Sequence, residues 1–96
     1  MVEGRVCIVT GAGRGIGREY ALMLGAHGGL VVVNDLGGSR DGTGTSDAAA
    51  QVVAEIEAMG GEAIANGGSV TEFEQMEKMV ADAKQKWGGV HVLINN

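Results

Sequence analysis

Short apolar runs alternate with longer stretches of helical spacing along the whole chain. Four runs rich in β-branched residues predict strands at about residues 5–10, 30–34, 62–66 and 90–94. The run Val31-Val32-Val33 has no polar residue at alternate positions, which is typical of a strand covered on both faces. Strands that alternate with helices in this way indicate βαβ units and a parallel sheet.

The three stretches between these strands carry apolar residues three and four positions apart, as one face of a helix does. We expect the first helix at about residues 15–26, and the third to begin at a capping box formed by Thr71 and Glu74. We also expect Met59 and Met79 to fill the core. The expected core-facing residues are Ile16, Tyr20, Met23 and Leu24 in the first helix, Ala49, Val52, Val53 and Ile56 in the second, and Phe73, Met76, Val80, Ala83 and Trp87 in the third.

Together these elements predict the α/β class, as a Rossmann-like doubly wound parallel sheet with the element order βαβαβαβ and the strand order 3-2-1-4. The last predicted strand has the composition of a central strand, yet only two residues follow it. A strand buried on both faces is out of place at a sheet edge. We therefore expect residues 1–96 to be the N-terminal portion of one larger domain, with the remainder missing.

Glycine supplies 18 of the 96 residues, and its placement separates two kinds of position. Three Gly-Gly pairs follow predicted helices, where a left-handed cap favours a residue without a Cβ atom. Two other pairs and one cluster follow predicted strands, at the carboxyl edge where open parallel sheets bind ligands. Flexible loops are the alternative for those two pairs. The cap pairs are Gly28-Gly29, Gly60-Gly61 and Gly88-Gly89, and the edge positions are residues 11–17, Gly37-Gly38 and Gly67-Gly68.

The cluster at residues 10–17, Thr-Gly-Ala-Gly-Arg-Gly-Ile-Gly, runs from a predicted strand into a helix. It lacks the lysine that a P-loop requires, and it fails the Gly-x-Gly-x-x-Gly spacing in every register. It matches Thr-Gly-x-x-x-Gly-x-Gly, in which Gly11 makes the turn, Gly15 admits a diphosphate and Gly17 packs the helix closely. Amide donors and the positive dipole end at a helix N-terminus attract such an anion. The turn therefore predicts a dinucleotide site.

Asp35 follows Gly17 by 18 residues, close to the spacing expected for a carboxylate that binds the adenosine ribose. Hydrogen bonds from the 2′- and 3′-hydroxyls to this carboxylate are worth about 1.5 to 3 kcal/mol. A 2′-phosphate would instead meet a like charge, at a cost of about 4 kcal/mol at an effective dielectric near 20. Arg14 favours the opposite choice, since a guanidinium can pair with that phosphate. We expect NAD as the cofactor, with NADP the less favoured alternative.

The chain resembles the N-terminal part of the short-chain dehydrogenase/reductase family. The resemblance covers nearly the whole chain: the glycine motif, Asp35, and a closing Asn95-Asn96 similar to the start of the family's Asn-Asn-Ala-Gly. Within the family, residues 4–6, 18–21 and 31–38 resemble the (3R)-hydroxyacyl-CoA dehydrogenase module of peroxisomal multifunctional β-oxidation enzymes. So does a glycine-rich insertion at residues 36–45.

The resemblance implies further site residues. It places the backbone of Ile16 at the diphosphate, Ser69-Val70 against the adenine, and Asn95-Asn96 beside the ribose. Gly68 departs from this branch, which usually has an acid there that bonds the adenine amino group; adenine recognition would then rest on Val70 packing and backbone groups. The full set of expected cofactor-binding residues is Gly11, Gly13, Arg14, Gly15, Ile16, Gly17, Asp35, Ser69, Val70, Asn95 and Asn96.

The resemblance also implies an NAD(P)-dependent oxidoreductase that interconverts a 3-hydroxyacyl and a 3-oxoacyl thioester, or a similar secondary alcohol and ketone, by hydride transfer. Family members use a serine and a Tyr-x-x-x-Lys pair, whereas the only tyrosine here, Tyr20, is followed four residues later by Leu24. We expect no catalytic residue within these 96 residues. The alternatives are a non-catalytic dinucleotide-binding module, a 3-oxoacyl-carrier-protein reductase that uses NADP, and a structural half-domain.

Composition bears on the partners. Seven basic and twelve acidic residues give a formal charge of −5, which opposes binding to nucleic acid or anionic membranes.

Cys7 is the only cysteine, and His27 and His91 lack neighbours at metal-ligand spacing, so we expect no disulfide and no metal site. No apolar run suits a signal peptide or membrane span, so we expect a cytoplasmic protein, peroxisomal if eukaryotic. The expected partners are a small-molecule substrate, such as an acyl thioester, and, for the full-length protein, further copies of itself.

Overall fold

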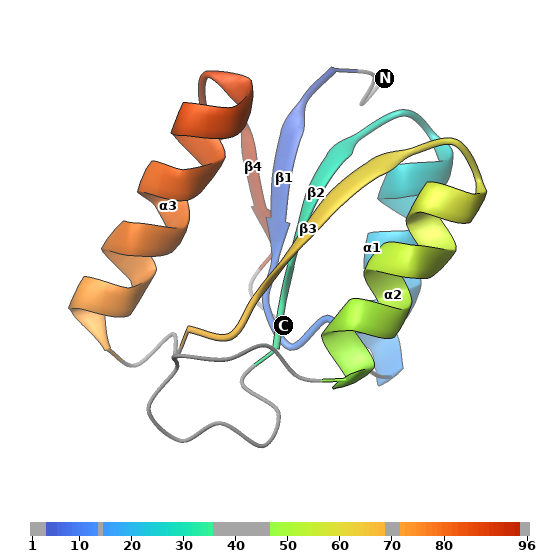
Figure 1. Ribbon diagram of the computed structural model, residues 1–96, viewed down its shortest axis with the longest axis horizontal. Coiled ribbons are helices and arrows are strands. Elements are labelled where there is room, and N and C mark those ends of the chain that lie inside the picture. The colour runs from blue at the N-terminus through green and yellow to red at the C-terminus, as the bar shows by residue number, and fades with distance from the viewer. Residues whose placement is uncertain (1–3, 14, 36–46, 69–71, 95–96) are drawn as a thin grey trace.

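The computed structural model describes residues 4–13, 15–35, 47–68 and 72–94 (Figure 1). In these residues, strands and helices alternate along the chain. The elements are β1 (Val6–Val9), α1 (Gly15–Ala26), β2 (Leu30–Asn34), α2 (Asp47–Ala58), β3 (Glu62–Asn66), α3 (Phe73–Trp87) and β4 (Val92–Ile94). Every element expected from the sequence is present, and only β1 and β4 are shorter than expected.

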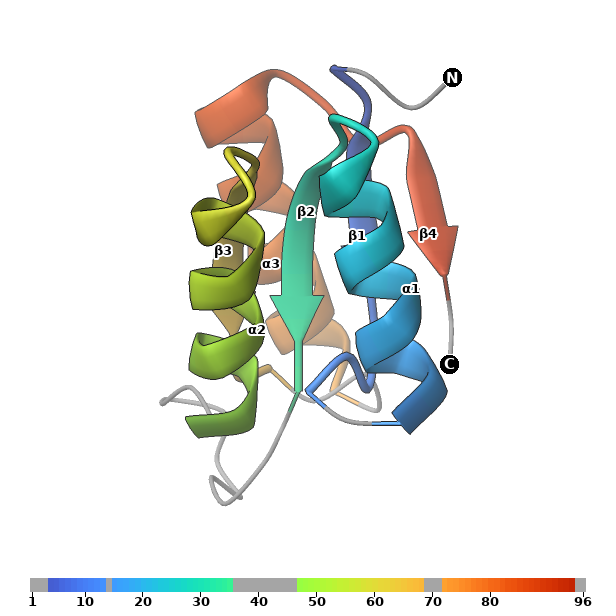
Figure 2. The ribbon, with the colours of Figure 1, turned by 90° about the vertical axis from the view of Figure 1, so that its right-hand side faces the viewer.

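The strands form one parallel sheet with the order β3-β2-β1-β4. The pairing sets Val9 beside both Val33 and Ile94, and it sets Asn34 beside Asn66. The carboxyl ends of the strands are therefore level with one another, at the lower edge of the sheet in Figure 2. The predicted α/β class and the 3-2-1-4 order are confirmed.

Helices cover both faces of the sheet. α1 and α2 lie on one face and α3 lies on the other (Figures 1 and 2). Val31 and Val33 of β2 belong to the core under α1 and α2, whereas Val32 belongs to the core under α3. All three are fully buried, and burial of such a side chain contributes about 1.5 to 3 kcal/mol. The unbroken apolar run in β2 thus has the two-sided burial that the sequence predicted.

α1 packs through small residues. A Cβ atom on Gly25 would lie 2.7 Å from Cγ2 of Ile56, so the α2 side chain occupies the space that the glycine leaves open. Near the other end of α1, Nη2 of Arg18 donates to both carboxylate oxygens of Glu55, at 2.8 and 2.7 Å. These two contacts hold α1 and α2 side by side. The buried residues of α1 are Gly17, Ala21, Leu24 and Gly25.

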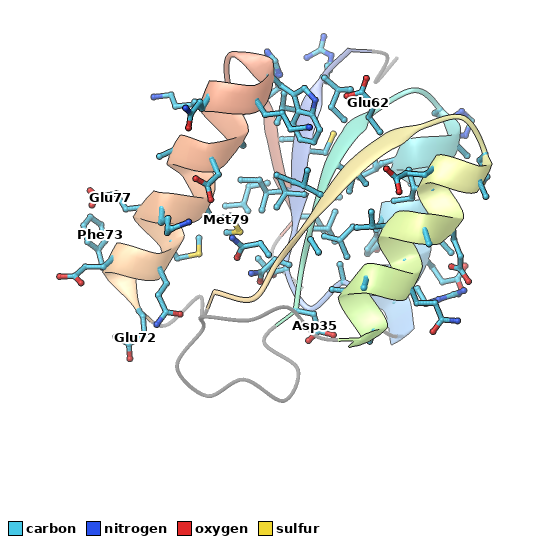
Figure 3. The ribbon with its side chains drawn as sticks, viewed as in Figure 1. Asp35, Glu62, Glu72, Phe73, Glu77 and Met79 are labelled. Carbon is cyan, nitrogen blue, oxygen red and sulfur yellow. The ribbon has the colours of Figure 1, made fainter. Side chains whose placement is uncertain are left out.

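Some apolar residues expected in the core are exposed instead. On α1, Ile16, Tyr20 and Met23 are 66, 41 and 48% exposed, because the helix contacts its neighbours through the side that carries the small residues. On α3, Phe73 is 77% exposed and points away from the sheet, whereas Met79 is buried (Figure 3). Phe73 precedes Met79 by six residues, which places it about 120° away around the helix. Met59, just after α2, is also exposed.

The helix ends agree with the glycine pattern better than with the capping box. Gly28, Gly60 and Gly88 have φ of 86°, 86° and 88°, which confirms the three predicted left-handed caps. The N-cap of α3 is Glu72, without a side-chain cap bond in the described residues, so α3 begins one residue later than the predicted capping box requires. Thr71 itself lies outside the described residues. None of the helices in the described ranges combines the length and hydropathy needed to cross a bilayer.

Candidate functional site

Three backbone segments meet at the carboxyl edge of the sheet. After β1, the N–H of Ala12 donates to the carbonyl oxygen of Asn34 at 2.8 Å. After β2, the N–H of Asp35 donates to the carbonyl oxygen of Asn66 at 3.0 Å. The glycine turn is therefore bound to the end of β2, and the end of β2 is bound to the end of β3.

The turn from β1 into α1 has the backbone conformation that its glycines predict. Gly11 and Gly15 have φ of 60° and 64°, in the left-handed region that disfavours a side chain. Ala12, between them, is fully buried. A Cβ atom on Gly15 would meet no atom of the described residues within 4 Å. The start of α1 therefore borders open space while the turn before it is packed.

The N-terminus of α1 is suited to an anion. The N–H groups of Gly15, Ile16 and Gly17 lie in the first turn, where a helix offers no backbone acceptor of its own. That turn carries no acidic residue, so no side chain within it neutralises the positive end of the helix dipole. Backbone amides of this kind bind phosphate groups without a basic side chain.

Asp35 lies directly against the glycine turn, at the carboxyl edge seen in Figure 3. A Cβ atom on Gly13 would lie 2.8 Å from Cγ of Asp35 and 2.9 Å from Cβ of Ala48. Oδ2 of Asp35 is buried, while the residue as a whole stays partly exposed. Gly13 is thus the position that lets the acid approach the turn, a contact that the motif spacing alone did not indicate.

The structure brings together all the expected site residues that it describes. These are Gly11, Gly13, Gly15, Ile16, Gly17 and Asp35, and all of them lie at or beside the carboxyl edge. The others lie outside the described residues, as does the insertion at residues 36–45, and their contacts stay predictions. They are Arg14, Ser69, Val70, Asn95 and Asn96.

Sequence reasoning missed two amide side chains beside Asp35. Asn34 is only 2% exposed, and its Nδ2 donates to Oδ1 of Asn66 at 3.0 Å and to the carbonyl oxygen of Gly68 at 2.9 Å. A signal for this contact existed in the sequence. Each asparagine is the last residue of a predicted strand, and the predicted strand order makes those two strands neighbours.

The thiol of Cys7 is buried in the core. Burial raises the pKa of the Cys7 thiol, and the charge of Arg5 offsets part of this effect. The neutral thiol is a weak nucleophile, so Cys7 serves as a small core residue. Among the described residues, no three His, Cys, Asp or Glu side chains gather in a way that would hold a metal ion. The candidate site therefore consists of backbone amides, glycines and one carboxylate.

Comparison with known proteins gives one family for nearly the whole chain. A family model described as short chain dehydrogenase matches residues 5–96. The peroxisomal multifunctional enzyme A of Dictyostelium discoideum is 56% identical over 95 residues, which cover 98% of this chain and 21% of that protein. The crystal structure of a short chain dehydrogenase from Mycobacterium avium superposes with a TM-score of 0.90 and 50% identity, over 99% of this chain and 34% of that one.

A third similar protein was solved with ligands. A 7α-hydroxysteroid dehydrogenase, complexed with NADH and 7-oxo glycochenodeoxycholic acid, superposes with a TM-score of 0.85 and 37% identity, over 99% of this chain and 34% of that one. The chain thus spans about a third or less of the length of each of these three proteins.

Proposed function

The chain belongs to the short-chain dehydrogenase family, as its motifs predicted, and we propose on this basis that it binds the adenosine diphosphate half of NAD. The observation that carries this proposal is the contact between Gly13 and Asp35. It sets a carboxylate suited to a ribose beside a helix N-terminus suited to a diphosphate. Those two groups are adjacent in the cofactor, so one bound molecule would reach both.

The diphosphate would be held by backbone amides. The first-turn N–H groups of Gly15, Ile16 and Gly17 supply donors, and the open space in front of Gly15 admits the phosphate oxygens. The exposed side chain of Ile16 is not required for this contact, because its backbone supplies the donor. We extend the proposal to Ser69-Val70 and Asn95-Asn96 in the roles that the family resemblance implies, and to Arg14 as a further member of the cofactor site.

Asp35 supports NAD over NADP. Members of this family use one or the other cofactor, and the carboxylate at the end of β2 would accept hydrogen bonds from the ribose hydroxyls. A 2′-phosphate at the same place would be repelled by about 4 kcal/mol per charge pair at an effective dielectric near 20. The contact with Gly13 holds this carboxylate in place, so the repulsion is not easily relieved by a side-chain rotation.

For the whole protein we propose an oxidoreductase that interconverts a 3-hydroxyacyl and a 3-oxoacyl thioester or a similar secondary alcohol and ketone. When bound, NAD supplies the acceptor for the hydride, and NADH supplies the donor in the reverse direction. The resemblance to the (3R)-hydroxyacyl-CoA dehydrogenase module, which includes the insertion at residues 36–45, supports the acyl thioester as substrate. The residues of this chain would bind and orient the cofactor, and the proton-transfer groups would come from outside it.

The exposed edge of β4 supports a larger domain. β4 is the last strand in the sheet order, and Leu93 in it is 54% exposed. We propose that residues 1–96 are the N-terminal portion of a single nucleotide-binding domain.

The full-length protein would act on a small molecule, self-associate and bind no nucleic acid. We propose the cytoplasm as its location, or the peroxisome if it is eukaryotic, the compartment named for the multifunctional relative.

A non-catalytic dinucleotide-binding module is the second candidate. One observation favours it: the groups at the carboxyl edge of the described residues, backbone amides and one carboxylate, suit cofactor binding alone. The two functions differ in one outcome: a module would bind NAD but show no turnover with any hydroxyacyl thioester in the longest available form of the protein.

Calorimetric titration with the two halves of the cofactor tests the proposal. We expect the chain to bind NAD and ADP-ribose with comparable affinity and to give no binding heat with nicotinamide mononucleotide. The reason is that the groups at the carboxyl edge contact only the adenosine diphosphate half. Absence of NAD binding, or binding of the nicotinamide half alone, would overturn the proposed function.

A further inference from the structure

The side chain of Asn34 is buried at the carboxyl edge, yet cofactor binding as proposed above makes no use of it. Its Nδ2 donates to Oδ1 of Asn66 at 3.0 Å and to the carbonyl oxygen of Gly68 at 2.9 Å. A longer contact of 3.4 Å reaches the carbonyl oxygen of Asn66. An amide nitrogen carries two hydrogens, so the two shorter bonds use its whole donor capacity.

Asn66 takes part in the same network as an acceptor. Its Oδ1 receives one bond from Asn34 and another from the N–H of Gly68, the latter at 2.8 Å. The backbone of Gly68 is therefore held at its donor by Asn66 and at its acceptor by Asn34. We call these three residues the amide clasp.

The clasp is joined to both parts of the proposed cofactor site. The carbonyl oxygen of Asn34 accepts the N–H of Ala12 in the glycine turn, at 2.8 Å. The N–H of Asp35 donates to the carbonyl oxygen of Asn66, at 3.0 Å. Asn34 is consequently bonded to the glycine turn on one side and to the segment after β3 on the other, and Asp35 follows it directly.

Gly68 fits the clasp because it has no side chain. It is buried, and a Cβ atom there would lie 3.0 Å from Oδ1 of Asn66 and 3.3 Å from Cβ of Gln75. Gly68 is thus packed between Asn66 and Gln75, near the beginning of α3. This packing and the two hydrogen bonds define one position for the backbone of Gly68.

We propose that Asn34 is a positioning residue for cofactor binding. The clasp sets the spacing among the glycine turn, Asp35 and Gly68, so that the adenosine half of NAD enters a site that is already formed. A preformed site avoids the free-energy cost of ordering protein groups during binding. This inference rests on the proposed function, and it assigns to Asn34 no contact with the cofactor.

Two isosteric substitutions that add the same negative charge separate a positioning role of Asn34 from a general effect of that charge. Asn34→Asp keeps the shape of the side chain but replaces both donors with a carboxylate that faces two acceptor oxygens, so it breaks the clasp. Asn66→Asp adds the same charge to the bonded partner, yet its carboxylate still accepts both bonds. The two variants have identical composition, yet we expect effects of different size.

We expect Asn34→Asp to weaken NAD binding about tenfold or more at neutral pH, because a buried donor pair is lost and two acceptors are left facing a carboxylate. Asn66→Asp should weaken binding much less, since only the added charge acts. Hydrogen exchange at the Gly68 N–H gives a second readout. It should accelerate in Asn34→Asp and stay close to the wild-type rate in Asn66→Asp.

Ile56→Val controls for a loss of stability. Ile56 lies in the core between α1 and α2 and is fully buried, so this truncation lowers the melting temperature without touching the carboxyl edge. We expect it to leave the NAD dissociation constant unchanged when measured well below the melting temperature. If Ile56→Val weakens NAD binding as much as Asn34→Asp does, stability alone explains the effect and the inference fails.

The remaining outcomes distinguish the inference from the proposed function. If the wild-type chain binds NAD and the two Asp variants bind it equally well, the clasp has no positioning role and the proposed function stands. If the wild-type chain binds no NAD, the proposed function fails. In that case, the Gly68 exchange rates still decide whether Asn34 holds the backbone of the segment after β3.

Discussion

The carboxyl group of Asp35 occupies the space into which a side chain on Gly13 would project. Gly13 belongs to the turn after β1, and Asp35 follows the end of β2, so the contact joins two neighbouring strands at their carboxyl ends. The glycine at this position is required for the approach of the acid. The glycine turn and Asp35 are therefore one packed unit.

Substitution of Gly13 tests this coupling. In Gly13→Ala, the new Cβ would lie 2.8 Å from Cγ of Asp35 and 2.9 Å from Cβ of Ala48, so the structure must shift at both contacts. We expect a loss of about 1 to 3 kcal/mol in the free energy of unfolding. We also expect weaker NAD binding, because Asp35 is displaced. Denaturant unfolding and calorimetric titration measure the two effects.

Gly89→Ala is the matched control for that experiment. A Cβ atom on Gly89 would meet no atom of the described residues within 4 Å, and the φ angle of Gly89 is not positive. Gly89→Ala should therefore change the unfolding free energy of the protein by no more than about 0.5 kcal/mol. Equal behaviour of the two variants in stability and in NAD affinity would show that Asp35 does not depend on Gly13.

Removal of the charge of Asp35 should change cofactor preference. If Asp35 binds the ribose as proposed, Asp35→Asn should weaken the hydrogen bonds from the ribose hydroxyls and remove the repulsion of a 2′-phosphate. We expect the ratio of NAD to NADP affinity to fall at least about tenfold, from titrations with each cofactor. Glu19→Gln removes the same charge from an exposed side chain of α1 and should leave the ratio unchanged. The same fall in both variants would refute a local role for Asp35.

The contact between α1 and α2 depends on Gly25. Alanine in place of a helical glycine gains up to about 1 kcal/mol from helix propensity. Here, the added Cβ would lie 2.7 Å from Cγ2 and 3.0 Å from Cγ1 of Ile56, and overpacking costs about 1 to 3 kcal/mol. We expect Gly25→Ala to be destabilising in thermal and denaturant unfolding.

A double-mutant cycle separates the two effects at Gly25. Ile56→Ala alone should cost about 2 to 5 kcal/mol, because it leaves a cavity. In that background, Gly25→Ala should become neutral or stabilising, since the clash is gone and the helix propensity remains. A cost of Gly25→Ala that is the same in both backgrounds would contradict the proposed contact.

His91 completes the pairing between β1 and β4. The buried N–H of Val6 donates to Nδ1 of His91 at 2.9 Å, and the N–H of His91 donates to the carbonyl oxygen of Val6 at 2.9 Å. His91→Ala leaves the first of these donors without its acceptor and should lower the unfolding free energy by about 1 to 3 kcal/mol. His91→Asn should restore much of it, because the amide oxygen can take the place of Nδ1. Equal stability of the Ala and Asn variants would argue against this bond.

Much of the fold could be predicted from the sequence because its signals are local. The unbroken valine run of β2 and the glycine caps depend on burial and backbone conformation near one position. The glycine turn and Asp35 were likewise found from their spacing and their place after predicted strands. The prediction that Phe73 faces the core was wrong, because the sheet contacts the side of α3 that carries Met79. The spacing of apolar residues alone does not specify which side of the helix is buried.

Contacts between segments distant in the sequence were not predicted. Gly13 against Asp35, Gly25 against Ile56, and the bond from Asn34 to Gly68 each join different elements. These contacts depend on how closely the elements approach one another. The spacing of apolar residues within one helix or strand does not specify that distance. Ile16, Tyr20 and Met23 show the same limit, since their exposure depends on which side of α1 the sheet and α2 contact.

Amide chemical shifts recorded during a titration with NAD locate the bound cofactor on the sheet. We expect saturating NAD to shift the N–H signals of Gly15, Gly17 and Asp35, which lie at the carboxyl edge. We expect little change at Gly28 and Gly60, which cap helices at the opposite edge. Shifts concentrated around Gly28 and Gly60, with none at Gly15 and Asp35, would contradict binding at the carboxyl edge.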